Sequence, residues 1–325
     1  MAKFPSQRKL MYVQENGVSN DGWTSAQSGG TAGDWNIPKD LSILNRRGYA
    51  STTRKGVPLV YRCKVDLFAT NYDGTGTTAA VGSDFVTTLQ VRGAQNNWVM
   101  RNAAVKWHAA LQSMRKKAGI KRKQIGAYAH EIRYNFDGNG DTWITPVDGD
   151  GAAFAGGTWD ATQFADEQDS AYSLKLVGLG IDEDTAAGLT SMQIGLSYLQ
   201  SRSQVPSDSN LESDETPAEH SHLLRLLSPN TENVLTDEIT DFTQGQGDNP
   251  PYDEVTTEDV NHDITEPVEL GRVLVGPGAQ HSSMIIDVPF GLAGVSLQHY
   301  DAADTNTTHN PMWTCEVLDI FEMQG

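Results

Sequence analysis

Residues 59–69 read LVYRCKVDLFA, and apolar and charged side chains alternate along this segment from Tyr61 onward. One face carries Tyr61, Cys63, Val65 and Leu67, and the other carries Arg62, Lys64 and Asp66. This period of two is typical of a β-strand that rests one face on a core. Residues 85–92, FVTTLQVR, are rich in the β-branched side chains that strands favour. Both segments predict a β-structured body.

Short apolar stretches of the same kind occur at 124–136, 171–177, 191–199, 268–275, 283–289 and 315–323, and we expect these to be strands as well. We also expect a short strand at 294–298. No repeat of 20–50 residues is present, and strands do not alternate with helices, which excludes solenoids and doubly wound folds. The sequence therefore predicts an all-β protein, a single jelly roll or other Greek-key sandwich with long insertions. A chain of 325 residues also has room for a double jelly roll.

One helix is expected within this β pattern, at about 98–118. Its apolar stripe consists of Met100, Ala103, Ala104, Trp107, Ala110, Leu111 and Met114, spaced three and four residues apart as on a surface helix. Asn96 or Asn97 is suited to cap its start, and Gly119 to end it. His108 falls on the polar side, where we expect it to be solvated.

The first fifty residues and residues 203–266 differ from the rest in composition. Residues 1–50 are rich in Gly, Ser, Thr and Asn, which predicts an extended arm in front of a body at 51–325. Its spaced apolar side chains are anchors suited to docking on a neighbouring copy, in particular Trp23, Trp35, Ile37 and Leu41. Residues 203–266 are dominated by acidic residues, Pro, Ser and Thr, and we interpret them as an acidic insertion of surface loops.

Charge is distributed unevenly along the chain. The net charge is −18, yet residues 1–133 hold 20 Lys+Arg against 8 Asp+Glu, a balance of +12. Residues 134–325 hold 4 against 34, a balance of −30. Such asymmetry favours a polyanionic partner for one surface, unless the fold interleaves the two halves and neutralises them.

The densest basic cluster has six cations within nine residues: Arg115, Lys116, Lys117, Lys121, Arg122 and Lys123. Cations at this density suit nucleic-acid phosphates, which they contact without reading the base sequence. The alternative is a solvated helix end balanced by acidic loops elsewhere.

A candidate metal loop spans residues 137–148. The oxygen donors Asp137, Asn139, Asp141 and Asp148 stand at positions 1, 3, 5 and 12. This spacing resembles the Ca²⁺ loop of EF-hands and dockerins. Thr142 stands where that loop has Gly, and Asp148 is shorter than the usual Glu. The alternative to a calcium site is a turn between two strands.

Signatures of enzymes are missing from the sequence: it has no GxSxG, HExxH or P-loop motif. We therefore expect a protein that is not an enzyme, with a carbohydrate-binding or carbohydrate-cleaving β-sandwich as the alternative.

Cys63 and Cys315 lack metal-site spacing and are expected to be buried thiols. No run of about 18 apolar residues is present, so no transmembrane segment is expected. The N-terminus lacks the apolar region of a secretory signal, which predicts synthesis in a cytoplasm.

Three segments carry a resemblance to a known family. They are NNWVMRNAAVKWHAALQSMRKKAG at 96–119, IRYNFDGNGDTWITPVDGDG at 132–151 and ELGRVLVGPGAQHSSMIIDVPFGLAGVSL at 269–297. With the Gly-rich N-terminal region, they resemble the major capsid proteins of small icosahedral DNA viruses, particularly those with circular single-stranded genomes.

The resemblance implies a jelly-roll subunit in a virion, a homo-oligomeric shell and a genome inside it. One feature departs from many such capsids, which have a long Arg-rich N-terminal arm. Residues 1–38 contain only Lys3, Arg8 and Lys9 as basic residues. Any contact with a genome is therefore expected through a folded basic surface.

Overall fold

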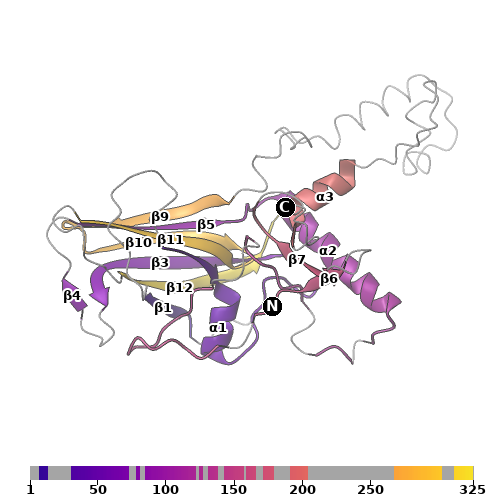
Figure 1. Ribbon diagram of the computed structural model, residues 1–325, viewed down its shortest axis with the longest axis horizontal. Helices are drawn as coiled ribbons and strands as arrows, with labels where there is room; N and C mark the ends of the chain where they lie inside the picture. The colour runs from indigo at the N-terminus through magenta and orange to yellow at the C-terminus, as the bar shows by residue number, and fades with distance from the viewer. Residues whose placement is uncertain are drawn as a thin grey trace, which may run out of the picture. The chain divides into compact units, whose positions relative to one another are not determined.

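The computed structural model (Figure 1) describes twelve stretches of the chain. They are residues 7–13, 31–72, 78–80, 85–121, 124–126, 131–137, 143–156, 159–165, 171–178, 191–203, 267–301 and 311–324. The chain divides into two compact units, residues 1–199 with 263–325, and residues 200–262. The predicted acidic insertion at 203–266 lies, except for Ser203, outside the described residues. The fold below is that of the first unit.

Two antiparallel β-sheets form the body of this unit. The first has the strand order β1 (Lys9–Val13), β12 (Pro311–Glu322), β3 (Leu59–Tyr72) and β10 (His281–Pro289), and the short β4 (Thr78–Ala80) also pairs with β3. The second has the order β2 (Thr31–Asn36), β11 (Leu292–Asp301), β5 (Phe85–Gly93) and β9 (Val268–Val275). The protein is thus mostly β-sheet, as predicted.

The strand pairs are nested. β5 pairs with β9, β3 with β10, β2 with β11 and β1 with β12, and every one of these pairs is antiparallel. Along the chain the pairs alternate between the two sheets. The chain therefore runs as one long hairpin wound around a common core. Five predicted strands, at 59–69, 85–92, 268–275, 283–289 and 315–323, are confirmed as β3, β5, β9, β10 and β12, and the short strand at 294–298 lies within β11.

The prediction of an extended arm at 1–50 is wrong for the residues that the structure describes there. β1 and β2 belong to the two sheets, and α1 (Ile37–Asn45) follows β2 directly. The Asn36 side chain caps α1 by accepting a hydrogen bond from the Lys39 amide at 2.9 Å. Short strands with little periodicity depend for their stability on the strand that they pair with. The partner of β1 is β12, which lies about 300 residues later in the chain.

Two further predicted strands are wrong. Of the predicted strand at 124–136, the described residues 124–126 and 131–136 form no strand and contain only an isolated bridge, between Asn135 and Lys175, and residues 127–130 lie outside the described residues. Residues 191–199 begin as the short β8 (Ser191–Gln193) and continue as the helix α3 (Ile194–Ser203). The Gln193 side chain accepts a hydrogen bond from the Leu196 amide at the start of this helix.

A second, smaller layer lies at one end of the sandwich. It consists of α2 (Trp98–Lys117) and a sheet of β6 (Gln163–Ala165), β7 (Ala171–Lys175) and β8. Figure 1 shows α2, β6 and β7 at this end and β4 at the other. The predicted helix is confirmed: the Asn97 side chain accepts a hydrogen bond from the Met100 amide at 2.9 Å, and Gly119 follows with φ of +69°.

Each layer has a buried apolar core. Between the large sheets, the ring of Trp313 stacks on Tyr12 at 4.2 Å and meets Trp35 edge to face at 5.2 Å. At the end of the sandwich, the apolar side of α2 packs with residues of the small sheet and of the β10–β11 turn, including Met100, Ala103, Ala104, Phe164, Leu174 and Phe290. This packing holds α2 in place and leaves its last turns exposed.

A polar network is buried beside the aromatic cluster. Asp40 is fully buried and accepts a hydrogen bond from the Tyr12 hydroxyl at 2.6 Å, while Trp35 Nε1 donates to the same hydroxyl oxygen at 2.8 Å. Burial raises the pKa of Asp40 to about 8, against smaller lowering effects of the Tyr12 hydrogen bond and the Lys39 charge. The other carboxyl oxygen, Oδ1, is buried without a hydrogen-bond partner among the described residues. The raised pKa favours the protonated form of Asp40 at neutral pH.

Candidate anion-binding pocket

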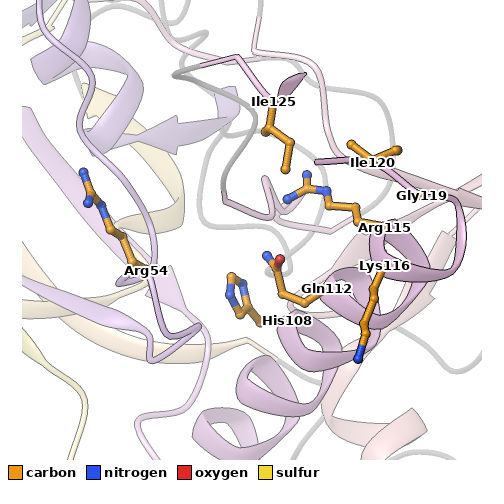
Figure 2. Close-up of a pocket in the computed structure, with 8 residues that line it drawn as sticks. All are labelled: Arg54, His108, Gln112, Arg115, Lys116, Gly119, Ile120 and Ile125. Atoms are coloured by element: carbon orange, nitrogen blue, oxygen red, sulfur yellow. The ribbon is translucent and has the colours of Figure 1, made fainter. Parts of the chain in front are cut away.

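A cavity of about 590 Å³ lies at the C-terminal end of α2 (Figure 2). The last turns of the helix, the chain that follows it and the turn at 53–57 form its walls. Its lining residues are Arg54, His108, Gln112, Arg115, Lys116, Gly119, Ile120 and Ile125. Three of the eight carry a permanent positive charge, so the cavity is suited to an anion.

The turn at 53–57 places Arg54 at the cavity. The Thr53 amide donates to the Val57 carbonyl at 2.7 Å, and the Gly56 amide donates to the Thr53 carbonyl at 2.9 Å. Gly56 has φ of +83°, and a Cβ at this position would lie 2.4 Å from the Cβ of His108. Only glycine satisfies both conditions. The turn therefore rests directly on α2.

The end of α2 places the opposite wall. The Gly119 amide donates to the Lys116 carbonyl at 3.1 Å, and the Ile120 amide donates to the Arg115 carbonyl at 3.0 Å. These two bonds form a Schellman motif, which reverses the chain at a left-handed glycine. As a result Ile120, which follows the helix, lines the same cavity as Arg115 and Lys116, which belong to its last turn.

His108 lies deep in the pocket wall. Its exposed fraction is 7%, and its Nδ1 is buried without a hydrogen-bond partner among the described residues. Burial lowers the pKa of His108, the charge of Arg115 lowers it further, and a hydrogen bond with the Arg54 backbone raises it. The imidazole is therefore neutral at physiological pH. The prediction that His108 is solvated is wrong, because the turn at Gly56 covers that side of the helix.

One carboxylate lies near this group of cations. Glu131 is half-buried, and burial raises its pKa while the charges of Arg133 and Arg54 lower it. Glu131 therefore offsets part of the charge of Arg54. It does not line the cavity, whose described walls carry no acidic side chain.

The predicted basic cluster is brought together only in part. Arg115 and Lys116 line the cavity, and Lys117 and Lys121 are exposed beside it. Arg122 and Lys123 lie outside the described residues. Sequence reasoning missed Arg54, because it stands 61 positions before Arg115 and only the turn on His108 places it here.

The predicted calcium loop is described only at its two ends. Asn139 and Asp141 lie outside the described residues. Asp148 Oδ1 accepts hydrogen bonds from the amides of Asp150 at 3.0 Å and Ala152 at 2.9 Å, so this carboxylate caps a turn. In the part of the chain that the structure describes, no three His, Cys, Asp or Glu residues are grouped as metal ligands. Calcium binding stays a prediction.

The predicted interface anchors are placed differently from our expectation. Trp35, Ile37 and Leu41 are fully buried in the core of their own chain, so the prediction that they dock on a neighbour is wrong. Trp23 lies outside the described residues. The prediction of buried thiols is confirmed: Cys63 and Cys315 are both buried and form no disulfide, and burial raises the pKa of the Cys315 thiol.

Comparison with known proteins adds no relative. No protein-family model matches the chain, and no curated protein or solved structure matches it. Among the described residues, no helix has the length and apolar character that crossing a bilayer requires.

Proposed function

We propose that the chain is a capsid subunit, built as a single jelly roll, whose copies assemble into a closed icosahedral shell around a viral genome. The nested strand order carries this proposal. The sheet orders β1-β12-β3-β10, to which the short β4 adds a fifth strand, and β2-β11-β5-β9 support the proposal, because a jelly roll has eight main strands in two sheets and occurs in many viral capsids. Both ends of the described chain belong to this one sandwich, which favours a single jelly roll over a double one.

The filled interior favours a structural role over a binding barrel. Jelly rolls also occur in lectins and cupins, and cupins use the space between the sheets. Here that space holds the rings of Tyr12, Trp35 and Trp313, which are in contact with one another and almost completely buried. A core packed in this way contributes to stability and offers a firm scaffold for contacts at the surface.

Contacts between copies are expected at one edge of the sandwich. β10 and β9 are edge strands of the two sheets, and they carry two exposed apolar side chains, Ile285 and Leu274, with exposed fractions of 64% and 47%. Edge strands favour pairing with other chains, and exposed apolar side chains add area that a partner buries. Since Trp35, Ile37 and Leu41 are buried within the subunit, this edge replaces the N-terminal arm in the assembly that we propose.

The test is assembly of the purified full chain, followed by light scattering and electron microscopy over a range of salt concentrations. We expect closed particles of uniform diameter, since homo-oligomers favour closed symmetry. A chain that stays monomeric under every condition would contradict the proposal and favour a binding module.

Paired variants locate the contact. Leu274→Ser with Ile285→Ser should reduce assembly without loss of folding, because both side chains are largely exposed. Met114→Ser is the matched control, because Met114 is an exposed apolar residue, with an exposed fraction of 45%, on α2 instead of the edge strands. Equal loss of assembly in both variants would remove the edge from the proposal.

A further inference from the structure

The pocket at the end of α2 has features that shell assembly does not require. It combines cationic groups with an apolar wall. Figure 2 shows the Arg115 side chain pointing into the space above Gln112 and His108, with Ile120 and Ile125 above it in this view. A plain electrostatic patch needs neither a buried imidazole nor two isoleucines.

The polar side of the pocket suits a phosphate. Arginine presents a planar fork of N–H donors that matches phosphate oxygens, and Lys116 adds a second positive charge. His108 contributes a polar atom, Nδ1, that is buried without a partner among the described residues. Because the imidazole is neutral and its other nitrogen bonds to the Arg54 backbone, Nδ1 is a hydrogen-bond acceptor. A ligand N–H group, such as that of a base, would satisfy this buried atom.

The size and the apolar wall indicate more than a bare phosphate. A cavity of about 590 Å³ is within the range of sites that hold whole small molecules. Ile120 and Ile125 supply an apolar surface for a flat ring, and an arginine guanidinium stacks on bases as well. A single strand turns a base into such a cavity at lower cost than a duplex, whose bases must first be unpaired and unstacked.

We propose that this pocket binds one nucleotide of a single-stranded nucleic acid. The phosphate lies against Arg115, with Gln112 beside it, and Arg54 and Lys116 attract the neighbouring phosphates. The base lies against Ile120 and Ile125. Binding of a strand at this pocket does not depend on the proposed capsid function. The inference rests on that function only in identifying the bound strand as the packaged genome.

The test measures binding of a fluorescently labelled oligothymidylate to the full-length chain by anisotropy, at several salt concentrations. Arg115→Gln should weaken binding at least tenfold. It should also reduce the slope of log K against log salt by about 0.7, the contribution of one single-strand phosphate contact. Lys106→Gln is the matched control, an exposed cation on the same helix outside the pocket, and its effect should be less than twofold. Equal effects of the two variants would overturn the proposal in favour of a diffuse basic surface.

A second variant tests the apolar wall and does not depend on a buried residue. Ile120 is exposed at 46%, so Ile120→Ser should fold normally. It should weaken oligothymidylate binding severalfold and leave the salt slope unchanged, because it removes no charge. Unchanged affinity would contradict the placement of the base.

Competition identifies the ligand. Unlabelled oligothymidylate should displace the probe at far lower concentration than thymidine monophosphate, inorganic phosphate or a duplex of equal length. Equal competition by the free monophosphate or by phosphate would contradict a strand as the ligand, and equal competition by the duplex would contradict base insertion.

The assembly assay separates this inference from the proposed function. If both hold, Arg115→Gln subunits form shells of normal diameter that contain less nucleic acid. Subunits that bind the strand through the pocket but never assemble would contradict the capsid function and leave the pocket inference standing. Shells whose nucleic-acid content is the same with and without Arg115 would contradict the pocket inference alone.

Discussion

Replacement of Asp40 by asparagine should remove a pH dependence of stability that the buried network creates. Asp40 is fully buried, and its pKa is raised from 3.8 to about 8. In the unfolded chain the carboxyl loses its proton near pH 4, whereas in the folded chain it keeps the proton until about pH 8. Between these values the folded state binds more protons, so the free energy of unfolding falls as pH rises.

The size of the effect follows from the pKa difference. Each unit corresponds to 1.36 kcal/mol, so the span of about four units sets a ceiling of ~6 kcal/mol. Below about pH 4 the carboxyl is protonated in both states, and above about pH 8 it is ionised in both, so the contribution changes only between them. Asparagine is neutral throughout and keeps an oxygen that accepts the Tyr12 hydroxyl. The variant and the natural protein should therefore differ least near pH 4, and the difference should shift in favour of the variant by several kcal/mol between pH 4 and pH 8.

The assay is urea unfolding of the full chain at pH 5, 6, 7 and 8, followed by tryptophan fluorescence, since Trp35 and Trp313 lie in the core beside this network. Asp319→Asn, which removes an exposed carboxylate from β12, controls for the change in net charge. The informative quantity is the stability difference between the Asp40 variant and the natural protein at each pH. A difference that stays constant from pH 5 to pH 8 would refute a protonated, buried Asp40.

Three other outcomes are expected. Gly56→Ala should lower the free energy of unfolding by about 1–3 kcal/mol and with it the melting temperature, because the added methyl meets His108 and the backbone has positive φ. Gly278→Ala is the control: its added methyl meets nothing within 4 Å, so the melting temperature should change little. If the loop at 137–148 binds calcium, a chelator should lower the melting temperature, since saturation at 100 times the dissociation constant stabilises by about 2.7 kcal/mol. The double change Asp137→Ala and Asp141→Ala should abolish that difference. A melting curve that is the same with and without chelator would contradict calcium binding and indicate an ordinary turn. Assembly should increase with ionic strength, because salt screens the repulsion between subunits of charge −18; assembly that weakens with salt would contradict this.

Elements with strong local patterns were predictable from the sequence. The alternation in β3 and the helical spacing in α2 each bury one face of a single segment, and the caps of α2 are set by residues adjacent to it, Asn97 and Gly119. Such patterns are encoded within about twenty residues. Composition misled where the partner was distant: β2 lies in the Gly-rich N-terminal region and becomes a strand because β11 pairs with it.

Of the candidate site, only the positive charge was predictable from the sequence. The run around Arg115 identified a basic region, because adjacent residues on one helix end share a surface whatever the rest of the fold. The pocket itself depends on Arg54 and on the burial of His108, and both follow from the turn at Gly56 packing on α2. The sequence by itself thus determined the strand pattern, the helix and the location of positive charge, which are local properties. Which strands pair, which side chains are buried and where a cavity remains were decided only by tertiary structure, since these depend on contacts between residues tens to hundreds of positions apart.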